Sequence, residues 1–394
     1  MTTQETIDLF DKYVIGNYKR LPRVITKGQG CYCFDADGNK ILDMFPGWAV
    51  SAIGHCHPKV IEAIRKQAGE LLHIDNTFYS EPQGKLAKLL SERAFGGKCF
   101  FCNSGAEANE AAFKLARLHT PEQKYKFITA RGSFHGRTFA SMTATAQPKH
   151  HEGLLPLLPG FVYVPFNDIA ALETAFSDEV AAVMVEPIQG EGGINIATEE
   201  YLQAIRRLCD ENGAVMILDE VQTGVGRTGK WFAYQHFDVE PDIMTMAKAL
   251  GGGVAIGAMM AKEEVAASLA PGKHASTFGG NALACAAAVA VIEAIEEENL
   301  LENAVQLGQY TKDKLEQLKQ KHFIIDSVRG VGLMIGVQLT SSGVEIADKC
   351  LEQGLRINCT QDTVLRFMPP MIATRSHIDQ AIDILDSVLT ESAK

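Results

Sequence analysis

The chain has 394 residues, of which 46% are hydrophobic and 22% are charged, a composition typical of globular proteins with room for two domains. Its formal net charge of −11 argues against nucleic-acid or anionic-membrane partners, because either would repel such a surface. An anionic ligand therefore has to be bound by local arginines.

The cysteines and the N-terminal segment bear on the compartment. The nine cysteines follow no disulfide framework, and neither Cys31-x-Cys33 nor His55-Cys56-His57 has the paired Cys-x-x-Cys spacing of a zinc site, so we expect a reducing, cytoplasmic environment and no metal centre. The opening stretch MTTQETIDLF lacks the basic and then apolar pattern of a signal peptide. No apolar run approaches the roughly 20 residues that span a bilayer, so no membrane partner is expected.

The first part of the chain, from about residue 6 to residue 45, predicts an N-terminal arm with a small hairpin, because the turn signal Asp37-Gly38-Asn39 separates two strand-like runs. From residue 47 on, apolar runs alternate with helical periods, which predicts β-α-β units and a parallel sheet with helices on both faces. Predicted strands cover residues 98–102, 126–129, 181–185, 214–218, 243–247 and 256–261, and predicted helices cover 107–118 and 199–210.

Beyond residue 281 the pattern predicts a smaller α+β unit. An alanine-rich helix over 282–298 and a charged helix over 307–321 lead to strands near 332–339 and 363–367 and to a final amphipathic helix over about 377–389. We therefore expect an α/β protein in three parts. These are an N-terminal arm and small-domain part, 1–47, a large domain with a mostly parallel central sheet, 48–281, and a C-terminal small domain, 282–394.

Lys248 stands out because it follows the apolar run 243–247 and precedes the flexible triplet Gly251–Gly253. Burial lowers the pKa of an ammonium group and leaves a free amine that can form an imine with a carbonyl compound. Taken alone, the pattern also fits a strand-end lysine whose head group reaches water.

Ser104, Gly105 and Ala106 end a predicted strand and open a predicted helix. Small residues at a helix N-terminus let backbone N–H groups face an anion such as phosphate. The alternative is an ordinary capping box, because Ser104 and Glu107 have the Ser-x-x-Glu spacing that any helix can use.

Asp219 ends the apolar strand 214–218, and a buried carboxylate there needs a cationic partner such as a protonated ring nitrogen. Gln222 is placed to hydrogen-bond a phenolic oxygen of the same ring, and Phe134 could stack on it. The alternative is a strand-end aspartate that caps the next turn. Together with Lys248 and the helix N-terminus, these residues are what a lysine-bound pyridoxal phosphate requires.

Two arginines are candidates for carboxylate binding. Arg137 lies in a glycine-flanked loop, and Arg366 ends a strand of the predicted small domain. A guanidinium group binds a carboxylate through two parallel hydrogen bonds. Either arginine alone also fits a surface ion pair.

Six segments, in order, resemble the class III aminotransferases, which are fold-type I pyridoxal-phosphate enzymes. They are NSGAEANEAAFKLAR from Asn103, SFHGRT from Ser133, VEPIQGEGG from Val185, LDEVQTGVGRTG from Leu218, AKALGGG from Ala247 and STFGGNALAC from Ser276. The resemblance covers nearly the whole chain. It implies a transaminase that works as a homodimer with shared active sites.

The resemblance also implies roles for single residues. Lys248 would link covalently to pyridoxal 5'-phosphate and move the proton between the substrate Cα and the cofactor, and Asp219 would pair with the ring nitrogen. The other implied cofactor contacts are Ser104, Gly105 and Ala106 at the phosphate, Phe134 and Gln222 at the ring, Glu186 behind them, and Thr277 from the second subunit.

Within the family the segments are most similar to those of acetylornithine aminotransferases. This likeness implies that Arg366 binds the α-carboxylate of glutamate or 2-oxoglutarate, and that Glu191 neutralises Arg366 while the other substrate is bound. That substrate would place its carboxylate on Arg137 and Tyr18, and Ser276 is assigned to the same pocket. A movable ion pair lets one pocket accept an α-amino and a terminal amino group in turn.

Trp48 departs from the pattern, because a small aliphatic residue is expected there in acetylornithine enzymes and a tyrosine in ornithine enzymes. Trp48 would reshape the floor of the substrate pocket, or else it is a core residue at the domain junction. Ornithine, N-succinyl-diaminopimelate and 4-aminobutyrate therefore remain alternative donors. An aminomutase would need no second carboxylate clamp, and a non-catalytic binding protein would be expected to have lost Lys248 or Asp219.

Overall fold

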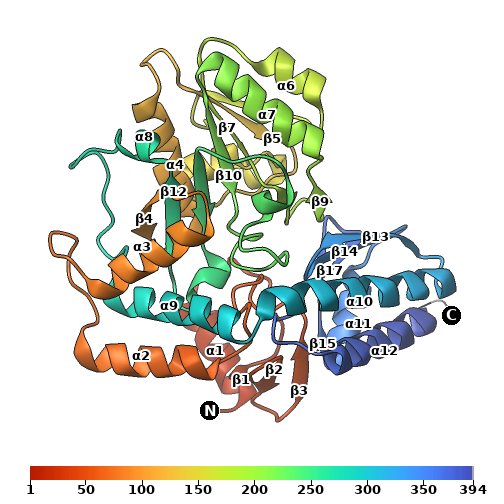
Figure 1. The fold of residues 1–394 in the computed structure, drawn as a ribbon. Helices are drawn as coiled ribbons and strands as arrows, with labels where there is room; N and C mark the ends of the chain where they lie inside the picture. The colour runs from red at the N-terminus through yellow and green to blue at the C-terminus, as the bar shows by residue number, and fades with distance from the viewer. Residues whose placement is uncertain (393–394) are drawn as a thin grey trace.

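The computed structural model describes residues 1–392, and a seven-stranded sheet lies at its centre (Figure 1). The strand order is β4-β12-β11-β10-β7-β5-β6. The strands are β4 (Lys98–Cys102), β5 (Lys126–Ala130), β6 (Phe161–Val164), β7 (Val180–Val185), β10 (Val215–Asp219), β11 (Ile243–Met246) and β12 (Gly257–Ala261).

The expectation of a mostly parallel sheet is confirmed, with one strand reversed. β12 runs antiparallel to both of its neighbours, β11 and β4, whereas the other neighbouring pairs are parallel. The connection from β11 to β12, residues 247–256, contains a short 3-10 helix, η3 (Lys248–Gly251). A parallel return needs a crossover of a dozen or more residues, so this short connection can only produce an antiparallel strand.

Both faces of the central sheet are buried, which explains the nearly continuous apolar runs of its strands. Along β10, Val215 and Ile217 pack into one hydrophobic cluster with residues of α4 (Gly105–His119). Met216 and Leu218 pack into another cluster with residues of α7 (Glu199–Asn212). The alternation of side chains along a strand thus places one helix on each face.

The C-terminal part forms a second, four-stranded sheet in the order β13-β14-β17-β16, to one side of the central sheet (Figure 1). The long helix α10 (Leu300–Lys321) packs against β13 and β14 and against α12. The strands are β13 (Ile325–Val331), β14 (Met334–Leu339), β16 (Asn358–Thr360) and β17 (Val364–Phe367), and the helices are α11 (Val344–Glu352) and α12 (Arg375–Ser392).

The N-terminal and C-terminal segments meet in a third sheet, β1-β2-β3-β15. The predicted hairpin is β2 (Tyr32–Asp35) and β3 (Lys40–Asp43), whose turn contains Gly38 at φ 84°. The remaining members are β1 (Ile25–Gln29) and β15 (Leu355–Arg356), which pairs in parallel with β3. The division of the chain into domains stays a prediction.

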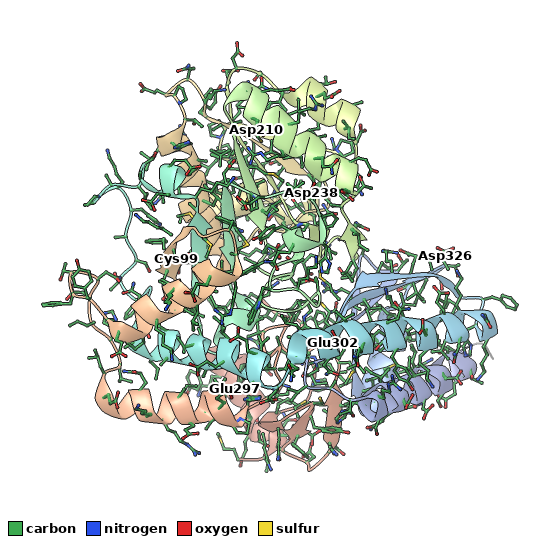
Figure 2. The ribbon with its side chains drawn as sticks, in the orientation of Figure 1. Cys99, Asp210, Asp238, Glu297, Glu302 and Asp326 are labelled. Atoms are coloured by element: carbon green, nitrogen blue, oxygen red, sulfur yellow. The ribbon has the colours of Figure 1, made fainter. Side chains whose placement is uncertain are left out.

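Helices cover the outside of these sheets. α9 (Ala282–Glu297) packs against α2 (Pro58–Glu70) and α3 (Glu81–Arg93), and Figure 2 shows Glu297 and Glu302 on either side of the α9–α10 junction. The shorter elements are α1 (Thr3–Tyr13), α5 (Phe139–Ala144), α6 (Ile169–Ala175), α8 (Glu263–Ala266), η1 (Pro148–His150), η2 (Ala233–His236), β8 (Ile188–Gln189) and β9 (Asn195–Ile196). Within residues 1–392, no helix combines the length and apolarity that crossing a membrane requires.

Candidate active site

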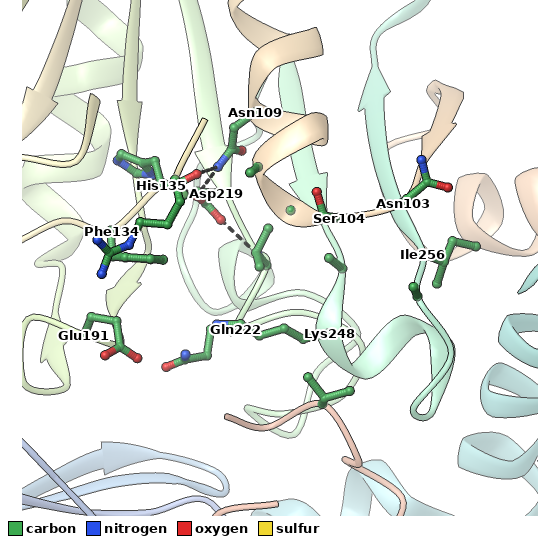
Figure 3. A pocket seen from close by; sticks show the side chains of 18 of the residues that line it. Asn103, Ser104, Asn109, Phe134, His135, Glu191, Asp219, Gln222, Lys248 and Ile256 are labelled. Atoms are coloured by element: carbon green, nitrogen blue, oxygen red, sulfur yellow. Dashed lines mark hydrogen bonds and ion pairs between the residues drawn. The ribbon is translucent and has the colours of Figure 1, made fainter. Parts of the chain in front are cut away.

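A cavity of about 420 Å³ lies at the carboxyl ends of β4, β5, β7, β10 and β11, which all run in the same direction. The loops that follow these strands line it, as expected for ligand sites in α/β sheets (Figure 3). The predicted site residues that line it are Ser104, Gly105, Ala106, Phe134, Arg137, Glu186, Glu191, Asp219, Gln222 and Lys248.

Lys248 is the first residue of η3, and only Ala247 separates it from the end of β11. Its backbone has φ 41°, a left-handed conformation that is strained for a residue with a side chain and that is often found at functional sites. Burial lowers the pKa of Lys248, and the carboxylates of Glu191, Asp219 and Glu186 oppose this effect. The net lowering of the pKa makes the neutral, nucleophilic amine more accessible.

Asp219 is buried, and its carboxylate is held from behind by two side chains that the sequence did not assign. Its Oδ2 accepts a hydrogen bond from Nδ2 of Asn109 at 2.8 Å and lies 2.8 Å from Nδ1 of His135. Its Oδ1 accepts from the backbone N–H of Val221 at 3.0 Å. Thr245 in turn donates to Oδ1 of Asn109 at 2.6 Å, so the orientation of Asp219 is fixed by a chain of hydrogen bonds.

The N-terminus of α4 points at the same cavity. Oγ of Ser104 accepts from the N–H of Glu107 at 3.2 Å. The Glu107 carboxylate reaches the N–H of Asn103 at 2.8 Å rather than that of Ser104, so only half of the alternative capping box forms. The N–H groups of the first turn have no acceptor within the helix and can bind an anion. At Gly105 an added Cβ would lie 2.8 Å from the Val221 side chain, so the close approach requires glycine.

Glu186 connects two loops of the site. Its Oε1 accepts from the N–H of Phe134 at 3.0 Å, and its Oε2 accepts from the N–H of Gly190 at 3.1 Å. Burial raises the pKa of Glu186 to about 7, although His135 and the two N–H groups oppose this effect. Glu186 thus holds the loop that carries Phe134 against the turn that precedes Glu191.

Glu191 and Arg366 form an ion pair at the cavity wall, with Nη1 to Oε1 at 2.8 Å. Arg366 is almost fully buried, and its Nε and Nη2 also donate to Oδ1 of Asn358 at 2.8 and 2.5 Å. Burial acts to raise the pKa of Glu191, but the charge of Arg366 and its hydrogen bonds outweigh burial, and the pKa lies below its usual value. Glu191 thus lines the cavity, and its partner Arg366 lies buried behind it in a preformed carboxylate–guanidinium pair.

Arg137 is the second arginine at the cavity. Its guanidinium lies 5.5 Å from the centre of the Phe134 ring, and its side chain is exposed. Within residues 1–392, Arg137 forms no ion pair, so its charge is available to a ligand.

Five predicted substrate or cofactor residues are outside the cavity lining, and one of them, Arg366, meets the lining through its ion pair with Glu191. Tyr18 is 68% exposed, and Thr277 is exposed in the loop before α9. Oγ of Ser276 accepts from Nδ2 of Asn103 at 3.3 Å, which places it near the N-terminus of α4. Trp48 is 48% exposed and faces a separate cavity of about 780 Å³, so the interpretation as a core residue is wrong.

Comparison with known proteins agrees with this geometry. The family model for class-III aminotransferases matches residues 13–389. The acetylornithine aminotransferase of Methanocaldococcus jannaschii is 52% identical over 398 residues, covering 100% of each chain. That of Caldanaerobacter subterraneus is 53% identical over 385 residues, covering 96% of this chain and 98% of the relative.

A solved structure is similar over the same length. The ornithine aminotransferase of Toxoplasma gondii, described with partial occupancy of PLP at its active site, superimposes with a TM-score of 0.93 and 35% identity over 99% of this chain and 96% of that one. The chain described here belongs to the class-III aminotransferases. Members of this family depend on pyridoxal 5'-phosphate.

The residues at the cavity fit this cofactor. The amine of Lys248, whose pKa is lowered, suits the aldehyde of the cofactor. The fixed carboxylate of Asp219 suits the ring nitrogen, and the N-terminus of α4 suits the phosphate. Oε1 of Gln222 is buried at the cavity and has no hydrogen-bond partner among residues 1–392, as expected of a group that contacts a ligand. When bound, pyridoxal phosphate accepts the amino group and stabilises negative charge at the substrate carbon.

Proposed function

We propose that the protein transfers the terminal amino group of N-acetylornithine to 2-oxoglutarate, giving N-acetylglutamate semialdehyde and glutamate, as in arginine biosynthesis. The two substrates react one after the other in a ping-pong cycle. The observation that carries this proposal is the ion pair between Glu191 and Arg366 at a cavity that also contains the exposed cation Arg137. Relatives named for acetylornithine match the whole chain at 52 and 53% identity.

Each residue at the cavity has a defined part in this proposal. The Nζ atom of Lys248 accepts the proton from the substrate carbon that bears the amino group, and its lowered pKa suits an amine to that task. Asp219 keeps the ring nitrogen charged, and Phe134 and Gln222 orient the ring. The backbone N–H groups at Ser104, Gly105 and Ala106 bind the phosphate, and Glu186 holds the Phe134 loop in place.

The ion pair explains how one cavity accepts two kinds of substrate. With N-acetylornithine bound, the only carboxylate lies far from the reacting amine, on Arg137 and Tyr18, and Glu191 keeps Arg366 neutralised. With glutamate or 2-oxoglutarate bound, the carboxylate beside the reacting carbon takes Arg366, and Glu191 moves away. Because Arg366 is paired with Glu191 in the first state and with the substrate carboxylate in the second, neither state leaves this buried cation without a partner.

We also infer that the enzyme is a cytoplasmic homodimer. Large apolar side chains are exposed near the site, as expected of an interface, and they include Phe78 at 62%, Phe139 at 63% and Phe278 at 61%. Thr277, next to Phe278, would reach the phosphate of the partner's cofactor, and Tyr18 and Ser276 would complete the substrate pocket in the assembled dimer. All nine cysteines are free, which suits a reducing compartment.

The donor is tested by half-reactions of the purified holoenzyme with N-acetylornithine, ornithine, N-succinyl-diaminopimelate and 4-aminobutyrate, each followed by the visible absorbance of the bound cofactor. We expect N-acetylornithine to react fastest and 2-oxoglutarate to restore the absorbance. If only another amine reacts, the proposed donor is wrong and the family assignment stands. Trp48 then becomes the first residue to replace, since tyrosine is expected there in ornithine enzymes.

A further inference from the structure

Arg227 is the largest fully buried charged side chain that has no part in the proposed function. Burial lowers its pKa to about 10, so it is still protonated at neutral pH. No carboxylate of residues 1–392 pairs with it, and its Nε and Nη2 have no hydrogen-bond partner. A buried cation without an ion pair is costly to stability, so its presence points to a task other than holding the fold together.

Among residues 1–392, Nη1 is the only side-chain nitrogen of Arg227 with hydrogen-bond partners, and it reaches residues that flank β14 and β17 of the C-terminal sheet. Its Nη1 donates to the carbonyl of Pro369 at 2.6 Å and to that of Leu333 at 3.3 Å, and the N–H of Leu333 donates back to the Arg227 carbonyl at 3.0 Å. In the antiparallel pairing of β14 with β17, Gly336 lies opposite Arg366. Leu333 and Pro369 each lie three residues further, at the open end of the same ladder.

Close backbone packing restricts the position of the turn that contains Gly332 and Leu333. Gly332 has φ 54°, and a Cβ added to it would lie 2.5 Å from the backbone carbon of Thr228. On its other side, a Cβ added to Gly308 of α10 would lie 2.2 Å from the Gly332 carbonyl oxygen. The turn between β13 and β14 is therefore clamped between α10 and the loop that carries Arg227.

We propose that Arg227 is a positioning residue for Arg366, the arginine that binds the carboxylate beside the reacting carbon. Arg227 fixes β17, and with it Arg366, relative to the loop that carries Gln222. Gln222 lies five residues before Arg227 in the loop that follows β10, so one short segment sets both the ring contact and the place of Arg366. Arg227 is not among the residues that line the cavity. The inference rests on the proposed function, since it takes Arg366 as the group that binds the acceptor.

The test compares Arg227→Met and Arg227→Lys with the wild-type holoenzyme in the two half-reactions separately. We expect Arg227→Met to raise the 2-oxoglutarate concentration for half-maximal rate about tenfold, because a displaced guanidinium no longer meets the carboxylate. The donor half-reaction, in which Glu191 occupies Arg366, should change less than about twofold. Arg227→Lys retains the charge and one donor, so it should restore part of the affinity.

A binding measurement without turnover gives a second readout. Glutarate carries two carboxylates and no reacting group, and its dissociation constant should rise by the same factor as the 2-oxoglutarate requirement. The control is Asn303→Ala, because Nδ2 of Asn303 donates to the carbonyls of Met371 and Ala373 at 2.5 and 3.0 Å, in the same segment but from α10. This control should lower the stability without changing the ratio of the two half-reactions.

Equal losses in both half-reactions, or an unchanged affinity for glutarate, would overturn the proposal. If Arg227→Met does not fold, the smaller shift of Arg227→Lys decides in the same way. If the wild-type enzyme does not use N-acetylornithine, the proposed donor is wrong but the role of Arg227 is not contradicted. The two half-reactions of the Arg227 variants can still be compared with any donor that reacts.

Discussion

The Nδ1 atom of His135 and the amide nitrogen of Asn109 meet at one oxygen of Asp219, each at 2.8 Å. The other oxygen is held by the N–H of Val221 at 3.0 Å. The carboxylate that would pair with the cofactor is thus oriented before any ligand binds. The groups that hold it come from α4, from the loop after β5 and from the loop after β10. Such preorganised groups need no rearrangement during the reaction.

A negative charge beside Asp219 should weaken cofactor binding. Asn109→Asp keeps the size of the side chain but places a second carboxylate within hydrogen-bond distance of Oδ2 of Asp219. Two like charges there cannot both be stabilised, so we expect the cofactor to bind roughly 30-fold more weakly, equal to about 2 kcal/mol. Equilibrium dialysis measures this change. Asn299→Asp, which adds the same charge at an exposed residue, should leave the affinity unchanged.

Removal of the Lys248 amine should abolish transamination without unfolding the protein. Lys248→Ala removes a group whose burial opposes its charge, so we expect the melting temperature to be unchanged or slightly higher. Cofactor should remain bound through the other contacts. Turnover with amino donor and 2-oxoglutarate is the measurement, and Lys262→Ala, at a lysine paired with Asp242 away from the cavity, is the control. Normal turnover by Lys248→Ala would refute the assigned role.

Neutralising Glu191 should change the balance between the two substrates. In the wild-type protein, Nη1 of Arg366 lies 2.8 Å from Oε1 of Glu191. In Glu191→Gln the guanidinium of Arg366 loses this anionic partner. We expect the half-reaction with glutamate to be retained or improved, and kcat/KM for N-acetylornithine to fall about tenfold, because a buried cation without a partner faces the apolar part of that substrate. The measurement is kcat/KM for both. A parallel fall of both values would show that the pair does not switch.

Glu220 should make the stability depend on pH in a direction opposite to that of a salt-bridged carboxylate. Burial raises the pKa of Glu220 to about 7 from its ordinary value of 4.5, although Thr223 and two backbone N–H groups oppose this. The folded state then holds the proton more tightly than the unfolded state. The stabilising contribution is full below pH 4.5 and is lost as the pH rises to about 7, by at most about 3 kcal/mol.

Urea unfolding at pH 5 and pH 8 measures this contribution. Glu220→Gln cannot titrate, so the free energy of unfolding of the wild-type protein should fall relative to that of the variant between the two pH values. Glu302→Gln, at an exposed residue of α10, should follow the wild-type protein at both pH values. An identical pH dependence in Glu220→Gln and wild type would contradict the raised pKa.

The central sheet could be predicted because its strands are long apolar runs with clear ends, as in β7 and β10, which are buried throughout. Where the apolar pattern of the sequence is weaker, no strand was predicted, as for β13 and β6. β13 has the sequence IDSVRGV, whose polar residues hide the alternation, and β6 is only four residues long. The reversed direction of β12 follows from the short connection that precedes it, which a strand-by-strand prediction does not weigh.

The candidate site could be predicted where chemistry follows from position on the chain. Asp219 ends a strand, Lys248 and Ser104 each lie two residues beyond the end of one, and the parallel sheet brings these strand ends together. Asn109 and His135 lie inside two of the family segments, but their contact with Asp219 depends on how α4 packs over the sheet. A polar residue on the buried face of a helix, as Asn109 is, is the signal that could have identified it.

Transfer of the terminal nitrogen itself is the most direct test of the proposed reaction. N-acetylornithine labelled with nitrogen-15 at its terminal amine is incubated with 2-oxoglutarate and the holoenzyme, and the glutamate formed is analysed by mass spectrometry. We predict glutamate that carries the label, together with a stoichiometric amount of the semialdehyde. Unlabelled glutamate, or none formed while another amine donates readily, would contradict the proposed activity.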